Sequence, residues 1–153
     1  MIKRLITQVV ESISVSTTTV SEPITREEAI RMATAVLMID VARADHVFED
    51  SEFNRVLTLI EQHFGLTAEQ ATSLVNVADE RAEDLVSLYE FTQLLHNNLD
   101  ETEKAKIIGL LWEIAYADGQ LDKYEDSLVL KISDLLHVSR GRVMRLKHDS
   151  RPA

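Results

Sequence analysis

A run of acidic residues occurs twice in this chain, and this repeat limits the possible folds more than any other feature. Residues 37–52 read LMIDVARADHVFEDSE and residues 110–125 read LLWEIAYADGQLDKYE. We call the first of these segments the first corner and the second one the second corner. Four acids of the first corner match four acids of the second at a constant offset of 73 residues: Asp40 with Glu113, Asp45 with Asp118, Glu49 with Asp122, and Glu52 with Glu125. Shared core packing could repeat the apolar positions, but it would not require four acids in register. The sequence therefore predicts a duplicated domain with two acidic corners.

Apolar residues recur at helical spacing along the chain, and no long segment alternates with a period of two. This pattern predicts an all-α bundle of about seven to eight helices, built from two pseudo-symmetric repeats. The first helix of the first repeat is expected to bury one face, and the polar stretch 78–84 predicts a bend. The predicted organisation is an N-terminal amphipathic helix and Ser/Thr-rich linker over 1–24, then a helical domain over 25–153 with repeat 1 at about 25–79, a connecting helix at about 83–98 and repeat 2 at about 100–149.

Several helix ends carry their own local signals. Ser, Thr and Asp side chains accept hydrogen bonds from the first backbone N–H groups of a helix, and a Glu or Gln three residues later completes a capping box. By this rule the predicted caps are Thr25, Thr67, Asp100 or Thr102, and Ser139. Gly65 predicts the end of the helix that begins near Ser51, because glycine adopts the left-handed conformation without a steric penalty.

The composition excludes several classes of protein. There are 26 acids against 16 Lys and Arg, a net charge of −10, so most of the surface is unsuited to nucleic acid or anionic lipid. The absence of cysteine excludes disulfides and thiolate chemistry and is compatible with a reducing compartment. No run approaches the ~20 apolar residues of a membrane span, and the N-terminal segment lacks the pattern of a secretory signal. We expect a cytoplasmic protein without a transmembrane segment.

Helix capping alone can explain the later acids of each corner, since carboxylates in a first turn complement the helix dipole. Asp45 and Asp118 are different, because each falls at the C-terminal end of a predicted helix, where the dipole disfavours negative charge. Asp40 and Glu113 lie among apolar residues at helical spacing. Arg43 could pair with Asp40, whereas no basic residue stands in the matching place beside Glu113. Asp40 and Glu113 could each be a solvated boundary carboxylate or a ligand-positioning acid.

Together, the acids suggest a cation site at each corner. Carboxylate oxygens at a tight turn suit Ca²⁺ or Mg²⁺ better than zinc or copper. The spacing is not that of an EF-hand. The predicted ligands are the eight acids of the two corners: Asp40, Asp45, Glu49, Glu52, Glu113, Asp118, Asp122 and Glu125.

The C-terminal segment, residues 140–153, has a net positive charge, whereas the rest of the chain is net negative. Its basic residues are Arg140, Arg142, Arg145, Lys147 and Arg151. They could pack against the acidic body and complement a helix C-terminus, or they could contact RNA or phosphate. The packing interpretation is favoured, and nucleic-acid binding is kept as the weaker alternative.

The second corner, with Ala117-Asp118-Gly119, Asp122 and Glu125, resembles the A-D-G-x-x-D-x-x-E motif of the tellurite-resistance protein B (TerB-like) family. Residues 85–91 also resemble a bacterial branch of that family, and the likeness covers roughly 25–145. It implies an all-helical, pseudo-two-fold bundle, a divalent-metal site at the acidic turns, and a link to tellurite or envelope stress through partner proteins. His46 stands where the motif has glycine, so the first corner is expected to be the weaker site.

Two classes of function fit these observations. The first is a non-enzymatic helical module whose corners bind a divalent cation or dock a protein partner, with a homodimer left open. The second is a metal-dependent hydrolase that uses the same carboxylates. A hydrolase would need a substrate-holding cation near the metal, and the corners offer only His46 and Lys123. The first class is therefore favoured.

Overall fold

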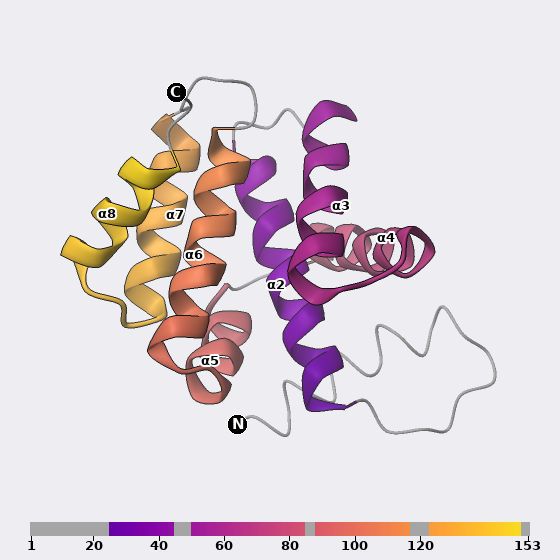
Figure 1. Ribbon diagram of the computed structural model, residues 1–153, viewed down its shortest axis with the longest axis horizontal. Helices are drawn as coiled ribbons and strands as arrows, with labels where there is room; N and C mark the ends of the chain where they lie inside the picture. The colour runs from indigo at the N-terminus through magenta and orange to yellow at the C-terminus, as the bar shows by residue number, and fades with distance from the viewer. Residues whose placement is uncertain (1–24, 45–49, 85–87, 117–122, 151–153) are drawn as a thin grey trace.

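The computed structural model describes residues 25–44, 50–84, 88–116 and 123–150, which form α-helices and no strand (Figure 1). The predicted all-α fold is confirmed. The helices are α2 (Arg26–Ala42), α3 (Asp50–Phe64), α4 (Ala68–Asp84), α5 (Tyr89–Asn98), α6 (Glu101–Ala115), α7 (Lys123–Leu135) and α8 (Arg140–Asp149). The predicted N-terminal helix and linker over 1–24 lie outside the described residues. No helix in the described ranges is both long and apolar enough to cross a membrane.

Helix α2 runs through the centre of the bundle, between α3 and α4 on one side and α6 on the other (Figure 1). Twelve of its 17 residues are buried, and they lie on all sides of the helix. The prediction of a single buried face was therefore wrong. Residues 35–39 form an unbroken apolar run, and a helix that is hydrophobic all round is typical of a core position.

Helix α6 is the central element of the second half and packs against α2, α3, α7 and α8. Trp112, the only tryptophan of the chain, is completely buried on it. Its indole Nε1–H donates to the carbonyl oxygen of Val143 in α8 at 3.2 Å. A buried indole N–H needs such a partner, so this bond fixes the position of α8 on the bundle.

The predicted caps are confirmed. Thr25, Thr67, Asp100 and Ser139 each accept a hydrogen bond from the backbone N–H three residues later, at 2.8–3.4 Å. Of the two alternatives for α6, Asp100 is the cap, and Glu103 completes a capping box with it. Gly65 follows α3 with a φ of 65°, the left-handed conformation expected there.

The bend predicted over 78–84 is wrong, because α4 continues to Asp84. Alanine, glutamate and arginine are good helix formers, and Ala78 is fully buried against the core. The polarity of this stretch reflects a helix with one exposed side. The next described helix, α5, accordingly begins at Tyr89 rather than near residue 83.

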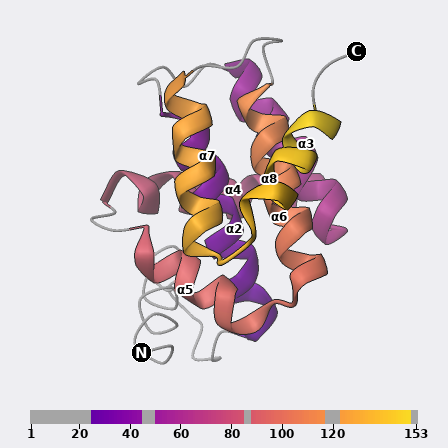
Figure 2. The ribbon, with the colours of Figure 1, turned by 90° about the vertical axis from the view of Figure 1, so that its left-hand side faces the viewer.

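Helices α2 and α6 end at the same end of the molecule, where α3 and α7 begin (top of Figures 1 and 2). Arg43 and Tyr116, 73 residues apart, follow α2 and α6 with nearly equal backbone angles of φ −95°, ψ 3° and φ −97°, ψ 9°. Helices α3 and α7 also begin 73 residues apart. The left-handed residues Gly65 and His137 are 72 apart, which fits the loss of one residue. These bounds follow the proposed repeat, while superposition of the two halves stays a prediction.

Candidate functional site at the acidic corners

The structure describes half of the eight predicted ligands. Asp40 and Glu113 lie near the ends of α2 and α6, and Glu52 and Glu125 lie in the first turns of α3 and α7. The remaining four are outside the described residues: Asp45, Glu49, Asp118 and Asp122. The described part of the chain contains no group of three Asp, Glu or His side chains that could hold a metal ion. The cation site therefore stays a prediction.

Glu52 and Glu125 are buried, with exposed fractions of 8% and 5%. Each is the third residue of its helix, where the backbone N–H groups and the helix dipole favour negative charge. Removing a carboxylate from water is costly unless hydrogen bonds or a cation compensate it. Both corners therefore enclose a carboxylate at the same position. The sequence predicted these acids in first turns, but it gave no sign that water would be excluded from them.

Asp40 lies on α2, the helix buried on all sides. Burial raises the pKa of its carboxyl from 3.8 to about 7, and the positive charge of Arg43 opposes this rise only in part. The same Arg43 side chain forms an ion pair with Asp79 of α4. Sequence reasoning expected Arg43 near Asp40, but it did not predict the pair with Asp79, which is 36 residues away along the chain.

Glu113, the counterpart of Asp40, has a cation that the sequence did not indicate. Arg55 of α3 reaches across to α6 and places its Nη2 atom 3.3 Å from Oε2 of Glu113. The two side chains are 46% and 40% exposed, so the pair contributes about 1 kcal/mol at most. The pair connects α3 with α6, which are distant in sequence.

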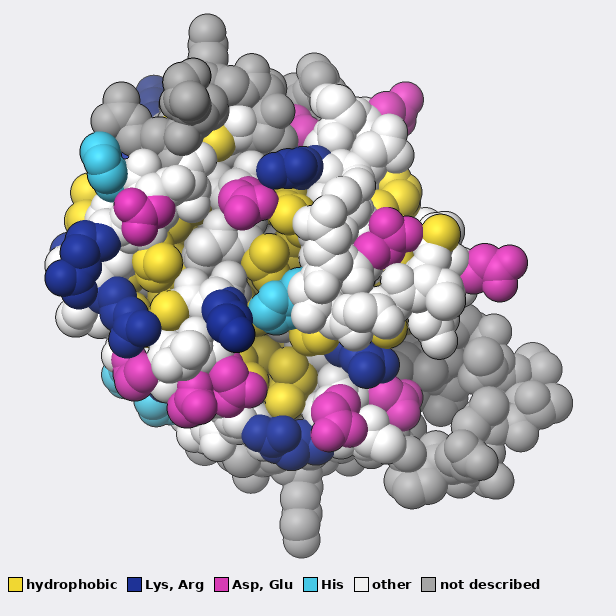
Figure 3. All heavy atoms as spheres, viewed as in Figure 1, with side chains coloured by type: hydrophobic (Ala, Val, Ile, Leu, Met, Phe, Trp, Pro, Cys, Tyr) yellow, Lys and Arg dark blue, Asp and Glu magenta, His cyan; other side chains and the backbone are white. Residues whose placement is uncertain are grey.

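The C-terminal basic segment packs against the acidic body in part, as the favoured interpretation predicted. Arg140 pairs with Asp134 at 3.0 Å, and Lys147 pairs with Asp126 of α7 at 2.6 Å. Lys147 also lies over the ring of Trp112, 5.2 Å from the centroid. Lys and Arg side chains occur on the left of Figure 3, where Figure 1 places α8. Binding of nucleic acid through this segment stays a prediction.

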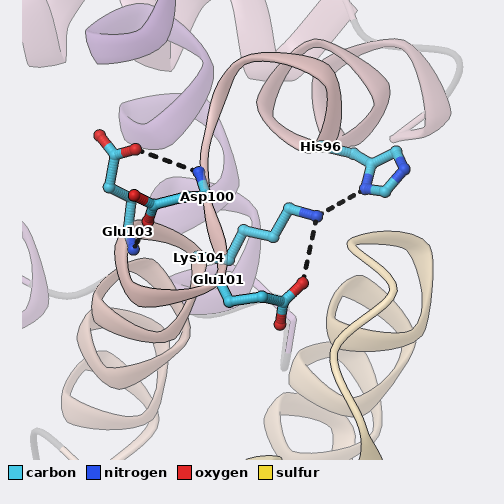
Figure 4. A network of polar contacts seen from close by, with 5 residues as sticks. All are labelled: His96, Asp100, Glu101, Glu103 and Lys104. Carbon is cyan, nitrogen blue, oxygen red and sulfur yellow. Dashed lines mark hydrogen bonds and ion pairs between the residues drawn. The ribbon is translucent and has the colours of Figure 1, made fainter.

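A second polar cluster was missed by sequence reasoning. His96 at the end of α5 and Lys104 on α6 are eight residues apart, and the fold brings His137, after α7, against the ring of His96. Figure 4 shows Lys104 reaching between His96 and Glu101. The five histidines of the chain have no regular spacing, so only the fold reveals this contact.

Comparisons with known proteins agree with the architecture. A structure of a protein of unknown function from Porphyromonas gingivalis W83 aligns with 80% of this chain and 94% of its own length. The TM-score is 0.61 and the sequence identity is 20%, so the similarity is one of fold. No curated protein matches the sequence.

The family comparison covers most of the bundle. The sequence model for tellurite resistance protein TerB matches residues 31–148, from the second turn of α2 to the end of α8. The match includes both acidic corners. It agrees with the resemblance seen in the A-D-G-x-x-D-x-x-E motif of the second corner. This chain is therefore a member of the family of tellurite resistance protein TerB.

Proposed function

We propose that this chain is a non-catalytic cytoplasmic module of the tellurite or envelope stress response. In this proposal its acidic corners bind Ca²⁺ or Mg²⁺ and present the cation to a protein partner. The observation that carries the proposal is the burial of Glu52 and Glu125 at matching positions of the two corners. Membership of the TerB family supports the tellurite connection. The family is named for a resistance rather than for a reaction, and the structural relative is a protein of unknown function.

Charge supports a cation at the second corner. Asp118 and Asp122 precede the buried Glu125 by seven and three residues, so their carboxylates would repel one another at close range. A divalent cation with oxygen ligands would relieve that repulsion. In the first corner, His46 replaces the glycine of the motif and fits a tight turn less well. We therefore expect the second corner to bind more tightly.

Calorimetric titration of the full chain with CaCl₂ and with MgCl₂ tests the proposal. The parent should give a heat of binding, and Asp118→Asn should lose most of that heat because one ligand charge is removed while the shape is kept. Asp45→Asn should have a smaller effect. Glu69→Gln is the matched control, since it removes an exposed charge from the first turn of α4, at the opposite end of that helix from Asp79, the partner of Arg43.

Two outcomes would reject cation binding at the second corner. One is the absence of heat from the parent at millimolar cation, and the other is equal heat from the parent and Asp118→Asn. Either result would leave the second corner as a docking surface or as helix caps.

A further inference from the structure

Lys104 is an unusual residue in this bundle because its side chain is almost completely buried. Its exposed fraction is 4%, although it lies in the first turns of α6. The ammonium Nζ lies 2.7 Å from Nδ1 of His96 and 3.8 Å from a carboxylate oxygen of Glu101 (Figure 4). Buried lysines are rare unless they are paired, so His96 and Glu101 determine whether Lys104 can stay in this position.

The contact defines the protonation state of His96. A lysine ammonium is only a donor, so Nδ1 of His96 must accept the bond, which makes the ring neutral with its proton on Nε2. The ring in turn donates a hydrogen bond to the backbone carbonyl of Leu136. The ring of His137 lies against that of His96, with a centroid separation of 4.3 Å and a tilt of 39°. His96 therefore connects α5, α6 and the turn that leads into α8.

His137 has a strained backbone. Its φ of 62° is left-handed, a conformation that costs a residue with a Cβ about 1–2 kcal/mol. The turn nevertheless places its ring beside His96. Among described residues this is the only left-handed residue other than glycine. The turn and the His96 contact therefore depend on each other.

We propose that His96 is a proton-sensitive latch that holds the α5–α6 junction against the α7–α8 turn, and that acidification releases it. A proton on Nδ1 would turn the acceptor into a donor that faces the Lys104 ammonium. Both groups would then be cationic donors, and the burial of Lys104 leaves little water to relieve the conflict. Release would loosen the turn and, with it, α8.

The charged groups around His96 favour its neutral form on balance, as release on acidification requires. Partial burial, Lys104 and His137 lower the pKa of His96, while the Leu136 backbone and Glu101 oppose the shift. Helix α2 also brings a cation to the end of α5, where the Nε–H of Arg26 donates to the side-chain oxygen of Asn98 at 3.1 Å. A depressed folded-state pKa means that the latch contributes stability above pH 6.5, the ordinary value, and loses it as the pH falls below that value.

The first test follows the ring signals of the five histidines by NMR in the full chain as the pH is lowered. His96 should titrate with a pKa below the ordinary value of 6.5. Each pKa unit below that value corresponds to about a tenfold shift, on protonation, of the equilibrium between the held and the released state. This measurement needs no variant. Titration of His96 at or above the ordinary value would overturn the proposal.

The second test compares the melting temperature at about pH 7.5 and about pH 5.5, on either side of the ordinary histidine pKa. The change in melting temperature on acidification should be less unfavourable in His96→Gln than in the parent, because the amide oxygen can accept from Lys104 and does not titrate. Asp40, whose raised pKa gives a contribution of the opposite sign, is present in both and cancels in this comparison. His148→Gln, an exposed position on α8, should show the same change as the parent. Trp112 emission should shift to the red on acidification in the parent and less in His96→Gln. Equal changes in melting temperature in His96→Gln and the parent would contradict the latch.

Discussion

Asp40 is an acid in a helix that the bundle surrounds. Its raised pKa means that the folded protein holds a proton that the unfolded chain releases. The stabilising contribution of this group is therefore fully present below 3.8 and is lost as the pH rises through about 7. This dependence has the opposite sign to that of His96.

We predict that, as the pH rises from about 5 to about 8, the free energy of unfolding changes less favourably in the parent than in Asp40→Asn, because only the parent loses the contribution of a protonated Asp40. Each unit of difference in pKa corresponds to about 1.4 kcal/mol, so the variant should be more stable than the parent at the alkaline end. Urea unfolding in the presence of a chelator measures the effect. Glu113→Gln, at the matching position on α6, is the control for loss of a charge. A parallel pH dependence in the parent and Asp40→Asn would show that Asp40 is ionised in the folded protein.

At the scale of the helices, the sequence predicted what depends on neighbouring residues. The caps at Thr25, Thr67 and Asp100 follow from side chains that bond to backbone groups three residues away, so a short window contains the whole interaction. The all-round burial of α2 and the unbroken course of α4 are compatible with their local sequences, an apolar run over 35–39 and helix-forming residues over 78–84. Other structures are compatible with the same residues, and the helices packed around α2 and α4 decide between them.

Gly109 provides a prediction at this scale. It lies in the middle of α6, where glycine is about 1 kcal/mol less favourable than alanine, and no atom lies within 4 Å of the position that a Cβ would occupy. Gly109→Ala should therefore stabilise the protein by about 0.5–1 kcal/mol in chemical unfolding. Gly65→Ala is the contrasting control, because a φ of 65° makes it destabilising by about 1 kcal/mol or more. A loss of stability in Gly109→Ala would mean that another group occupies the space beside this glycine.

At the scale of the whole molecule, the sequence predicted two acidic corners but not how their acids pack against other helices. The eight acids could be found because they recur with a fixed offset. The burial of Glu52 and Glu125 and the pair between Arg55 and Glu113 could not be predicted, because they arise from packing between helices that are distant in sequence. Likewise, Lys147 meets Asp126 only because α8 folds back along α7.

The net charge of −10 leads to a last prediction for the folded molecule. Excess negative charge destabilises a compact state through self-repulsion, and any salt screens it over a distance of about 10 Å at 0.1 M. NaCl should therefore raise the melting temperature without a specific site. A bound divalent cation adds a second contribution that grows with the logarithm of its concentration. At equal ionic strength, CaCl₂ or MgCl₂ should then stabilise the parent more than NaCl does. In Asp118→Asn this difference should shrink while the response to NaCl remains. If the divalent salts and NaCl give the same melting temperature for the parent at every ionic strength, the acids act only through the overall charge.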